Sequence, residues 1–189
     1  MIALPNYADI NGRPMKKLQI EQYLRKLQLN DFEPAVNLTT LTKLQDAHLK
    51  YIPYENFDSL NGKITSLKRQ DMFNKVIMHN RGGICFELNG LYNWLLESLG
   101  FEVTSYAARF IDKMETYQLR RHRVMCVALG EKRYLTDVGV NSESPRVPLE
   151  ITEGLIQSDG ISQYKFTRSE FWGWLLWQKE CGKIWKRLF

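Results

Sequence analysis

The stretch Arg81-Gly82-Gly83-Ile84-Cys85-Phe86-Glu87-Leu88-Asn89 is the most informative part of this chain. The paired glycines end one apolar-periodic segment. Cys85 begins the next segment, which continues to Leu99. Phe86, Asn89, Trp94 and Leu95 recur there at steps of three and four residues, which is helical spacing, and Gly100 supplies the stop signal. A thiol in the first turn of a helix lies beside unpaired backbone N–H groups and the positive end of the helix dipole, and both favour the thiolate. The sequence therefore predicts a nucleophile at Cys85, although a free cysteine more often fills a core.

A nucleophilic thiol needs a base, and the chain holds three histidines. Two of them have structural explanations. His48 lies on the apolar stripe of a predicted helix. His79 lies in the last turn of another predicted helix, where it would interact with the C-terminal end of that helix. His122 instead opens a strand-like run that ends at Leu129. His122 is therefore the candidate base.

Asp137 is the natural third member of such a site. A turn at Glu131-Lys132 is predicted to join the strand of His122 to the strand-like run that contains Asp137, and the two residues then project from the same face. Ideal pairing places Asp137 opposite Cys126, about 13 Å along the strand from His122. A bend or bulge is then needed to join imidazole and carboxylate. Spacing permits a Cys-His-Asp relay without establishing one.

These residues resemble the arylamine N-acetyltransferase family. Its motif Arg-Gly-Gly-x-Cys-x-Glu-x-Asn is matched within residues 81–89, and its histidine before an apolar strand is matched by His122. Its Asp-Val-Gly motif is matched at residues 137–139, and an upstream Ile-Pro-aromatic-Glu-Asn motif is matched at residues 52–56. The resemblance covers nearly the whole chain, with the motifs in the family's order.

The resemblance implies an acyltransferase that moves an acetyl group from acetyl-CoA to an arylamine or hydrazine. The implied mechanism is ping-pong, through an acetyl-cysteine at Cys85, with acetyl-CoA as a cosubstrate and no permanently bound cofactor. It implies a catalytic triad of Cys85, His122 and Asp137, in which His122 moves protons and Asp137 fixes the imidazole tautomer. It also implies that Arg81 and Glu55 pair to brace the site.

Two other functions remain open for the same residues. A cysteine hydrolase or transglutaminase-like enzyme uses the same triad on peptide or amide substrates. An inactive binding protein, a remnant of the family that retained the fold, is the third possibility. Acylation by acetyl-CoA separates the first function from the other two.

Two features depart from the family pattern. Relatives usually read Asp-Val-Gly-Phe-Gly, whereas Val140 and Asn141 follow Gly139 here, which removes an aromatic wall expected near the acceptor pocket. The chain also ends at Phe189, where relatives usually continue into a third, C-terminal domain. We therefore expect a short form of the family, which forms a homodimer through its C-terminal strands because aromatic surface is left uncovered there.

The expected fold class is α+β. A helical lobe over residues 1–100 carries the nucleophile, and an antiparallel, barrel-like β-rich lobe over residues 101–189 carries the histidine and aspartate, with a papain-like Cys-His-Asp site at their junction. Helical periodicity covers Met15–Leu27, Thr39–Lys50, Gln70–Asn80 and Cys85–Leu99. Strand-like alternation covers Phe101–Ile111, His122–Leu129, Arg133–Gly139, Gln163–Arg168 and Phe171–Gln178.

Composition adds limits on partners and location. The 189 residues are 44% hydrophobic with a net charge of +5, and the three cysteines suggest neither a disulfide framework nor a metal site. No signal peptide and no apolar run of about 18 residues is found, so we expect a cytoplasmic protein without a membrane partner. The arginines around His122 (Arg120, Arg121 and Arg123) are by default solvated, and alternatively attract coenzyme A phosphates. No nucleic-acid partner is expected, because no recognition module frames the basic residues.

Overall fold

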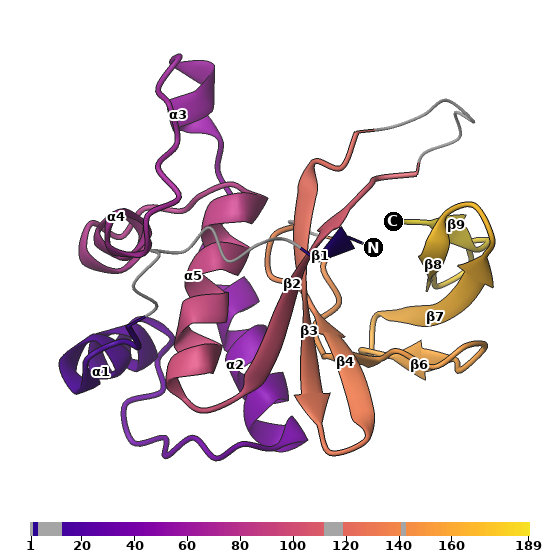
Figure 1. The fold of residues 1–189 in the computed structure, drawn as a ribbon, viewed down its shortest axis with the longest axis horizontal. Coiled ribbons are helices and arrows are strands. Elements are labelled where there is room, and N and C mark those ends of the chain that lie inside the picture. Colours follow the sequence, from indigo (N-terminus) through magenta and orange to yellow (C-terminus); the bar gives the residue numbers. More distant parts are fainter. Residues whose placement is uncertain (1, 4–12, 112–118, 141–142) are drawn as a thin grey trace.

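The computed structural model describes residues 2–3, 13–111, 119–140 and 143–189. A layer of helices packs on one face of a first β-sheet, and a second sheet lies on the other side (Figure 1). The helical elements are α1 (Lys17–Lys26), α2 (Leu38–Tyr51), α3 (Phe57–Leu60), α4 (Arg69–Phe73), the π-helix η1 (Asn74–Met78) and α5 (Cys85–Ser98). The α+β class predicted from the sequence is confirmed.

Both sheets are antiparallel. The first has the order β1 (Ile2–Ala3), β2 (Glu102–Ala108), β3 (His122–Leu129), β4 (Lys132–Thr136), β5 (Leu149–Glu150). The second has the order β6 (Gln157–Ser158), β7 (Ser162–Ser169), β8 (Gly173–Glu180), β9 (Lys186–Arg187). The predicted barrel-like closure is not confirmed, since neither sheet closes among the described residues. The edge strands are two residues long, too short for edge-to-edge closure, and the sheets instead share a core. The division into lobes at residue 100 stays a prediction.

The alternation along β3 decides which side chains reach each layer. Met125 and Val127 join the core under the helices, whereas Val124 joins the core between the two sheets. His122 has the parity of Val124, so it points toward the second sheet. Arg123 has the parity of Met125 and points toward the helices, where its guanidinium bonds the Ser105 hydroxyl at 2.8 Å.

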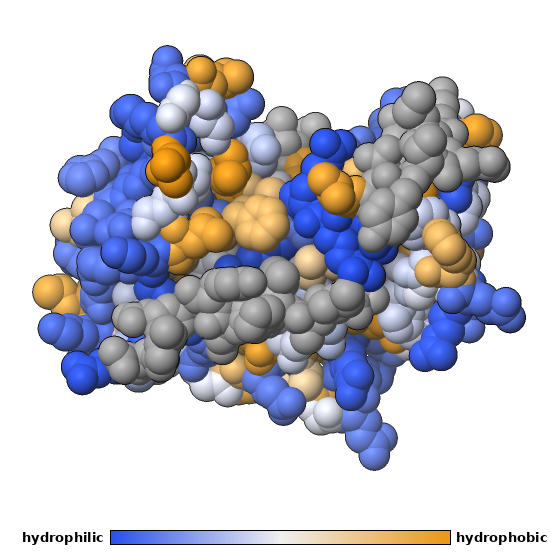
Figure 2. Space-filling view, turned by 45° about the horizontal axis from the view of Figure 1, so that its top comes forward, coloured by the Kyte–Doolittle hydropathy of each residue, from blue (hydrophilic) through white to orange (hydrophobic). Residues whose placement is uncertain are grey.

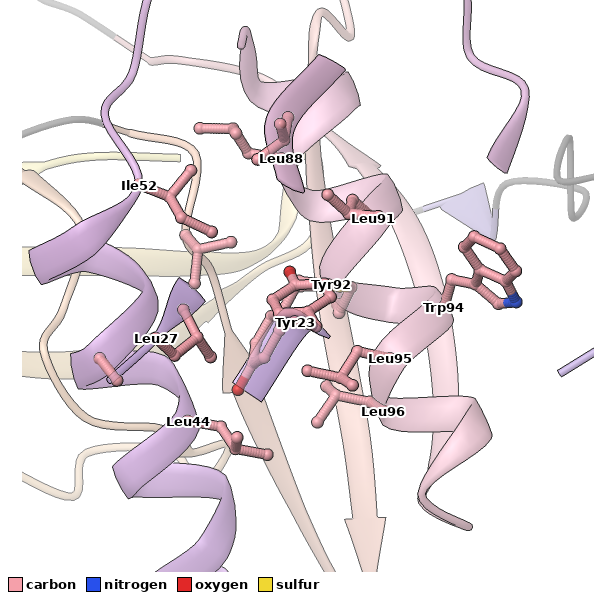
Figure 3. Close-up of a cluster of buried hydrophobic side chains, with 14 of the residues drawn as sticks. Tyr23, Leu27, Leu44, Ile52, Leu88, Leu91, Tyr92, Trp94, Leu95 and Leu96 are labelled. Atoms are coloured by element: carbon pink, nitrogen blue, oxygen red, sulfur yellow. The ribbon is translucent and has the colours of Figure 1, made fainter. Parts of the chain in front are cut away.

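The helix α5 is nearly surrounded by protein. Its buried face packs against α1 and α2, as Figure 3 shows for Tyr23, Leu27 and Leu44 beside Tyr92 and Leu95. The helix begins after Ile84, which has an extended backbone and whose N–H donates to Glu87 Oε2 at 2.9 Å. It ends before Gly100, whose φ of +91° lies in the left-handed region that favours glycine. The predicted helix over Cys85–Leu99 is thus confirmed to within one residue.

Hydrophilic residues cover much of one face of the molecule (Figure 2). On the face that Figure 2 shows, hydrophobic side chains form small patches separated by hydrophilic ones. The short helix α3, which the sequence patterns did not predict, exposes Phe57 and Leu60, and Ile64 follows it in the same exposed segment. No helix among the residues with described positions is long and apolar enough to cross a membrane.

His48 lies in the core of the helical layer, as its position on the apolar stripe predicted. It is fully buried between the rings of Tyr23 and Tyr92, with centroid distances of 6.0 and 5.3 Å. Neither ring nitrogen has a hydrogen-bond partner among the described residues. Burial lowers the pKa of His48 from 6.5 to about 3. His48 is therefore a neutral core residue.

This burial predicts acid sensitivity of the fold. The unfolded chain binds a proton at His48 below pH 6.5 and the folded chain only near pH 3, so stability is lost as the pH falls through that window. Between about pH 7.5 and about pH 5, the wild type should lose about 2 kcal/mol more unfolding free energy than His48→Leu. Urea unfolding at both pH values measures this difference, and other titrating groups cancel in the comparison. Equal losses in the two proteins would contradict a buried, neutral His48.

Candidate active site

Cys85 is the first residue of α5 and lies at the edge of the helical layer, next to β3. Its side chain is 9% exposed, and its Sγ lies 3.8 Å from the carbonyl oxygen of Arg121. Gly139 closely approaches its α-carbon, because a β-carbon added to Gly139 would lie only 2.8 Å from that atom. Glycine is thus needed at position 139, because the loop after β4 lies in direct contact with the backbone of Cys85.

His122 and Asp137 meet in the interior. The Nε2 atom of His122 lies 2.6 Å from Oδ2 of Asp137, and both side chains are fully buried. The predicted turn at Glu131-Lys132 was wrong by one residue. Leu129 pairs with Lys132, so the turn is Gly130-Glu131, with Gly130 at a φ of +61°.

The corrected turn removes the need for a bulge. In the observed register Met125 faces Thr136, which directs Asp137 toward the position of Val124 rather than Cys126. Asp137 is then two residues along from His122 instead of four, and the chain leaves the ladder after Thr136. Imidazole and carboxylate therefore meet through normal strand pairing followed by a short exit loop.

Asn89 holds the other oxygen of Asp137. Its side-chain N–H groups donate to Oδ1 of Asp137 at 2.8 Å and to the carbonyl of Arg123, and its Oδ1 accepts from the N–H of Val138 at 2.9 Å. The N–H of Gly139 also donates to Oδ1 of Asp137 at 2.8 Å. Asn89 thereby ties α5, β3 and the loop after β4 together. The sequence contained its signal, because Asn89 follows Cys85 by four residues and shares its helix face.

The buried pair sets the charge state of His122. Burial alone lowers the pKa of His122, but the charge and hydrogen bond of Asp137, together with contacts from Cys85, outweigh it and raise the pKa to about 10. The other ring nitrogen, Nδ1, has no hydrogen-bond partner among the described residues and is left for the thiol. The arrangement can therefore take a proton from Cys85 and hold it as a buried imidazolium.

Cys85 and His122 open onto a cleft of about 560 Å³, a size that suits a small molecule. Its other lining residues are Tyr54, Phe110, Arg121, Gly139, Val140 and Glu143. Phe110 and Phe189 pack on the imidazole, with ring centroids 4.9 and 5.3 Å away. The aromatic rings exclude water from His122 while the sulfur side of the site stays open to ligands.

A network of charged side chains surrounds the segment that leads into Cys85. Glu87, nearly fully buried, accepts from Lys75 at 2.8 Å while its second oxygen caps Ile84. Lys75 also pairs with Asp58 at 3.0 Å. The expected pair of Arg81 and Glu55 is present at 2.7 Å. These links fix the segment before α5 from both sides.

The paired glycines of the motif are required by space. A side-chain carbon at Gly82 would lie 2.0 Å from the carbonyl oxygen of Pro53, and one at Gly83 would lie 2.9 Å from Glu87. Any other residue would push the 52–55 segment or the capping carboxylate away. The motif is thus a packing requirement of the turn into α5.

The remaining predicted positions divide between surface and interior. Arg121 is exposed at the cleft, whereas Arg123 is buried on the far face of β3 and cannot reach a ligand there. Val140 lines the cleft, and Asn141 lies outside the described residues. No group of three or more histidine, cysteine or acidic residues within the described part of the chain could hold a metal ion.

The comparisons with known proteins agree with this geometry. Residues 37–189 match a family model described as N-acetyltransferase. An arylamine N-acetyltransferase of Mycolicibacterium smegmatis is 35% identical over 152 residues, which are 77% of this chain and 55% of that protein. An arylamine N-acetyltransferase of Escherichia coli (strain K12) is 33% identical over 132 residues, which are 69% of this chain and 47% of that protein.

The solved structures show the same fold. The arylamine N-acetyltransferase from Salmonella typhimurium aligns with a TM-score of 0.84 at 26% identity, covering 92% of this chain and 62% of that one. This chain is a member of the arylamine N-acetyltransferase family. It spans about half of the length of the curated relatives named above.

The buried pair generates a prediction for the reactivity of Cys85. In Asp137→Asn the carboxylate charge that opposes burial is gone, so the pKa of His122 falls and the thiolate at Cys85 loses its counterion. Alkylation by iodoacetamide near neutral pH should slow by at least roughly tenfold. Asp46→Asn, at a half-exposed carboxylate on α2, is the matched control and should leave the rate unchanged. An unchanged rate in Asp137→Asn would show that the pair does not govern the thiol.

Proposed function

We propose that this protein transfers an acetyl group from acetyl-CoA to an arylamine or hydrazine, by a ping-pong mechanism through an acetyl-cysteine at Cys85. The observation that carries the proposal is the juxtaposition of a helix-start thiol with a buried His122–Asp137 pair at a ligand-sized cleft. Membership of the arylamine N-acetyltransferase family supports the reaction type.

The first half-reaction acylates the enzyme. Nδ1 of His122 takes the thiol proton, and the Cys85 thiolate attacks the thioester carbonyl, forming a carbon–sulfur bond and an oxyanion. Collapse of this intermediate breaks the bond to coenzyme A, whose thiolate receives the proton from the imidazolium. One thioester replaces another, so the step costs little free energy.

The second half-reaction transfers the acetyl group. The amine nitrogen attacks the acetyl-cysteine carbonyl, and His122 accepts the proton that the nitrogen loses. Expulsion of the Cys85 thiolate leaves the amide product and regenerates the ion pair with His122. Asp137, held by Asn89 and Gly139, keeps Nε2 of the imidazole engaged throughout.

The partners in this proposal are small molecules that enter the cleft. Val140 in the cleft wall leaves room that an aromatic residue would fill, so the acceptor site favours a broad ring. The homodimer and the cytoplasmic location stay predictions from the sequence.

Intact-mass measurement after mixing with acetyl-CoA tests the proposal. The wild type should gain the mass of one acetyl group, which an added arylamine should remove, and Cys85→Ser should gain none because its hydroxyl is not ionised by His122. Cys181→Ser, at an exposed cysteine that is not among the cleft-lining residues, is the control and should be acetylated normally. A wild type that stays unmodified by acetyl-CoA yet cleaves amides would favour the hydrolase or transglutaminase-like alternative.

A further inference from the structure

Tyr54 lies at the mouth of the cleft beside the nucleophile. Its side chain is 40% exposed and lines the cleft together with Cys85. Its backbone forms a parallel bridge with Gly83, and the N–H of the next residue, Glu55, donates to the Gly83 carbonyl at 3.0 Å. Tyr54 is thus fixed to the segment that leads into Cys85, at a point two residues before the nucleophile.

The hydroxyl of Tyr54 has no hydrogen-bond partner among the residues that the structure describes, although the ring is partly covered. It can therefore donate to a ligand. Partial burial, followed by the negative charge of Cys85, raises the pKa of Tyr54 above 10.0. The phenol therefore stays protonated at neutral pH, and it lines the same cleft as Cys85.

Acyl transfer at Cys85 needs donors for an oxyanion. Each half-reaction passes through a tetrahedral carbon bonded to Sγ, whose oxygen carries a full negative charge in a site shielded from water. One donor is the backbone N–H of Cys85, since the first N–H groups of a helix have no intrahelical partner. An oxyanion usually accepts from two donors, and the N–H of Cys85 supplies one of them.

The other groups of the cleft are already engaged. The N–H of Gly139 donates to Asp137, and the N–H of Val140 donates to the Ser144 hydroxyl at 2.9 Å. Nε2 of His122 is bonded to Asp137, and Nδ1 holds the proton taken from the thiol. Phe110 has no polar group, and Glu143 is an acceptor that pairs with Lys186 at 2.7 Å. Among the described residues that line the cleft, the side chains of Tyr54 and the exposed Arg121 can still donate.

We propose that the phenol O–H of Tyr54 is the second donor to the oxyanion formed at Cys85. Tyr54 is a better candidate than Arg121, because it is pinned at Gly83 while the Arg121 side chain extends into solvent. Tyr54 is then a catalytic residue that stabilises both tetrahedral intermediates. This assignment rests on the proposed acyl-transfer function.

Tyr54→Phe removes the hydroxyl and keeps the ring, so it tests this role directly. The acylation rate is measured with p-nitrophenyl acetate, by the burst of nitrophenol, and with acetyl-CoA, by intact mass. Loss of one oxyanion donor should slow acylation by roughly a hundred- to a thousandfold. Alkylation of Cys85 by iodoacetamide forms no oxyanion, so its rate should not change.

Two variants are matched controls. Tyr51→Phe alters a half-exposed tyrosine three residues earlier, outside the cleft, and should acylate at the wild-type rate. Arg121→Gln removes the rival donor and should retain most of the acylation rate with p-nitrophenyl acetate, which has no phosphate for Arg121 to bind. A large loss in Arg121→Gln with none in Tyr54→Phe would assign the donor to Arg121 and overturn the proposal.

The outcomes separate this inference from the proposed function. A wild type acylated by p-nitrophenyl acetate but not by acetyl-CoA overturns the proposed acetyl donor, while the comparison with Tyr54→Phe still decides the role of Tyr54. Equal acylation rates in wild type and Tyr54→Phe overturn the oxyanion role. Alkylation that slows as much as acylation also overturns it, because Tyr54 would then act through the thiol. A wild type that neither donor acylates overturns both.

Discussion

The hydrogen-bonded pair of His122 and Asp137 is the interaction on which the site depends. An ionised carboxylate and an imidazolium, both without solvent access, are stable only when each is fully partnered. Asp137 meets this condition through His122 on one oxygen and through Asn89 and Gly139 on the other. Because these partners come from α5, β3 and the loop after β4, the pair can form only when helix and sheet are docked. The chemistry of the site and the packing of its layers are therefore one constraint.

Close backbone approach is the second part of that constraint. The Pro53 carbonyl fills the space at Gly82, the Glu87 side chain fills the space at Gly83, and Cys85 itself fills the space at Gly139. The contacts at Gly82 and Gly139 each bring a segment from elsewhere in the chain against the start of α5. The loop at Gly139 touches the main chain of Cys85, whose side chain lines the cleft.

Much of this could be predicted from the sequence. The helix after Gly83, the strand from His122 and the core position of His48 follow from local periodicity, and three histidines make the choice of base short. The predicted turn falls one residue late, because Leu129 pairs with Lys132 and the tight turn therefore begins at Gly130, which has a positive φ. The spacing from Cys85 places Asn89 on the same helix face, but its bonds to Asp137 and Val138, like the proposed role of Tyr54, depend on contacts between distant segments, which no local pattern records. The predicted barrel-like lobe is not observed, because neither sheet closes among the described residues and the edge strands are two residues long.

His48 and His122 show how environment gives one residue type opposite roles. Both are fully buried, but the ring nitrogens of His48 have no hydrogen-bond partner among the described residues, so burial lowers its pKa to about 3 and it stays neutral. Asp137 reverses the effect of burial at His122 and raises its pKa to about 10. The stabilisation linked to His122 is complete below pH 6.5 and is lost as the pH rises toward 10, whereas the stability linked to His48 is complete above pH 6.5 and is lost as the pH falls toward 3. The two contributions are together greatest near pH 6.5. At that pH the same fold holds a neutral histidine in its core and a charged one beside its nucleophile.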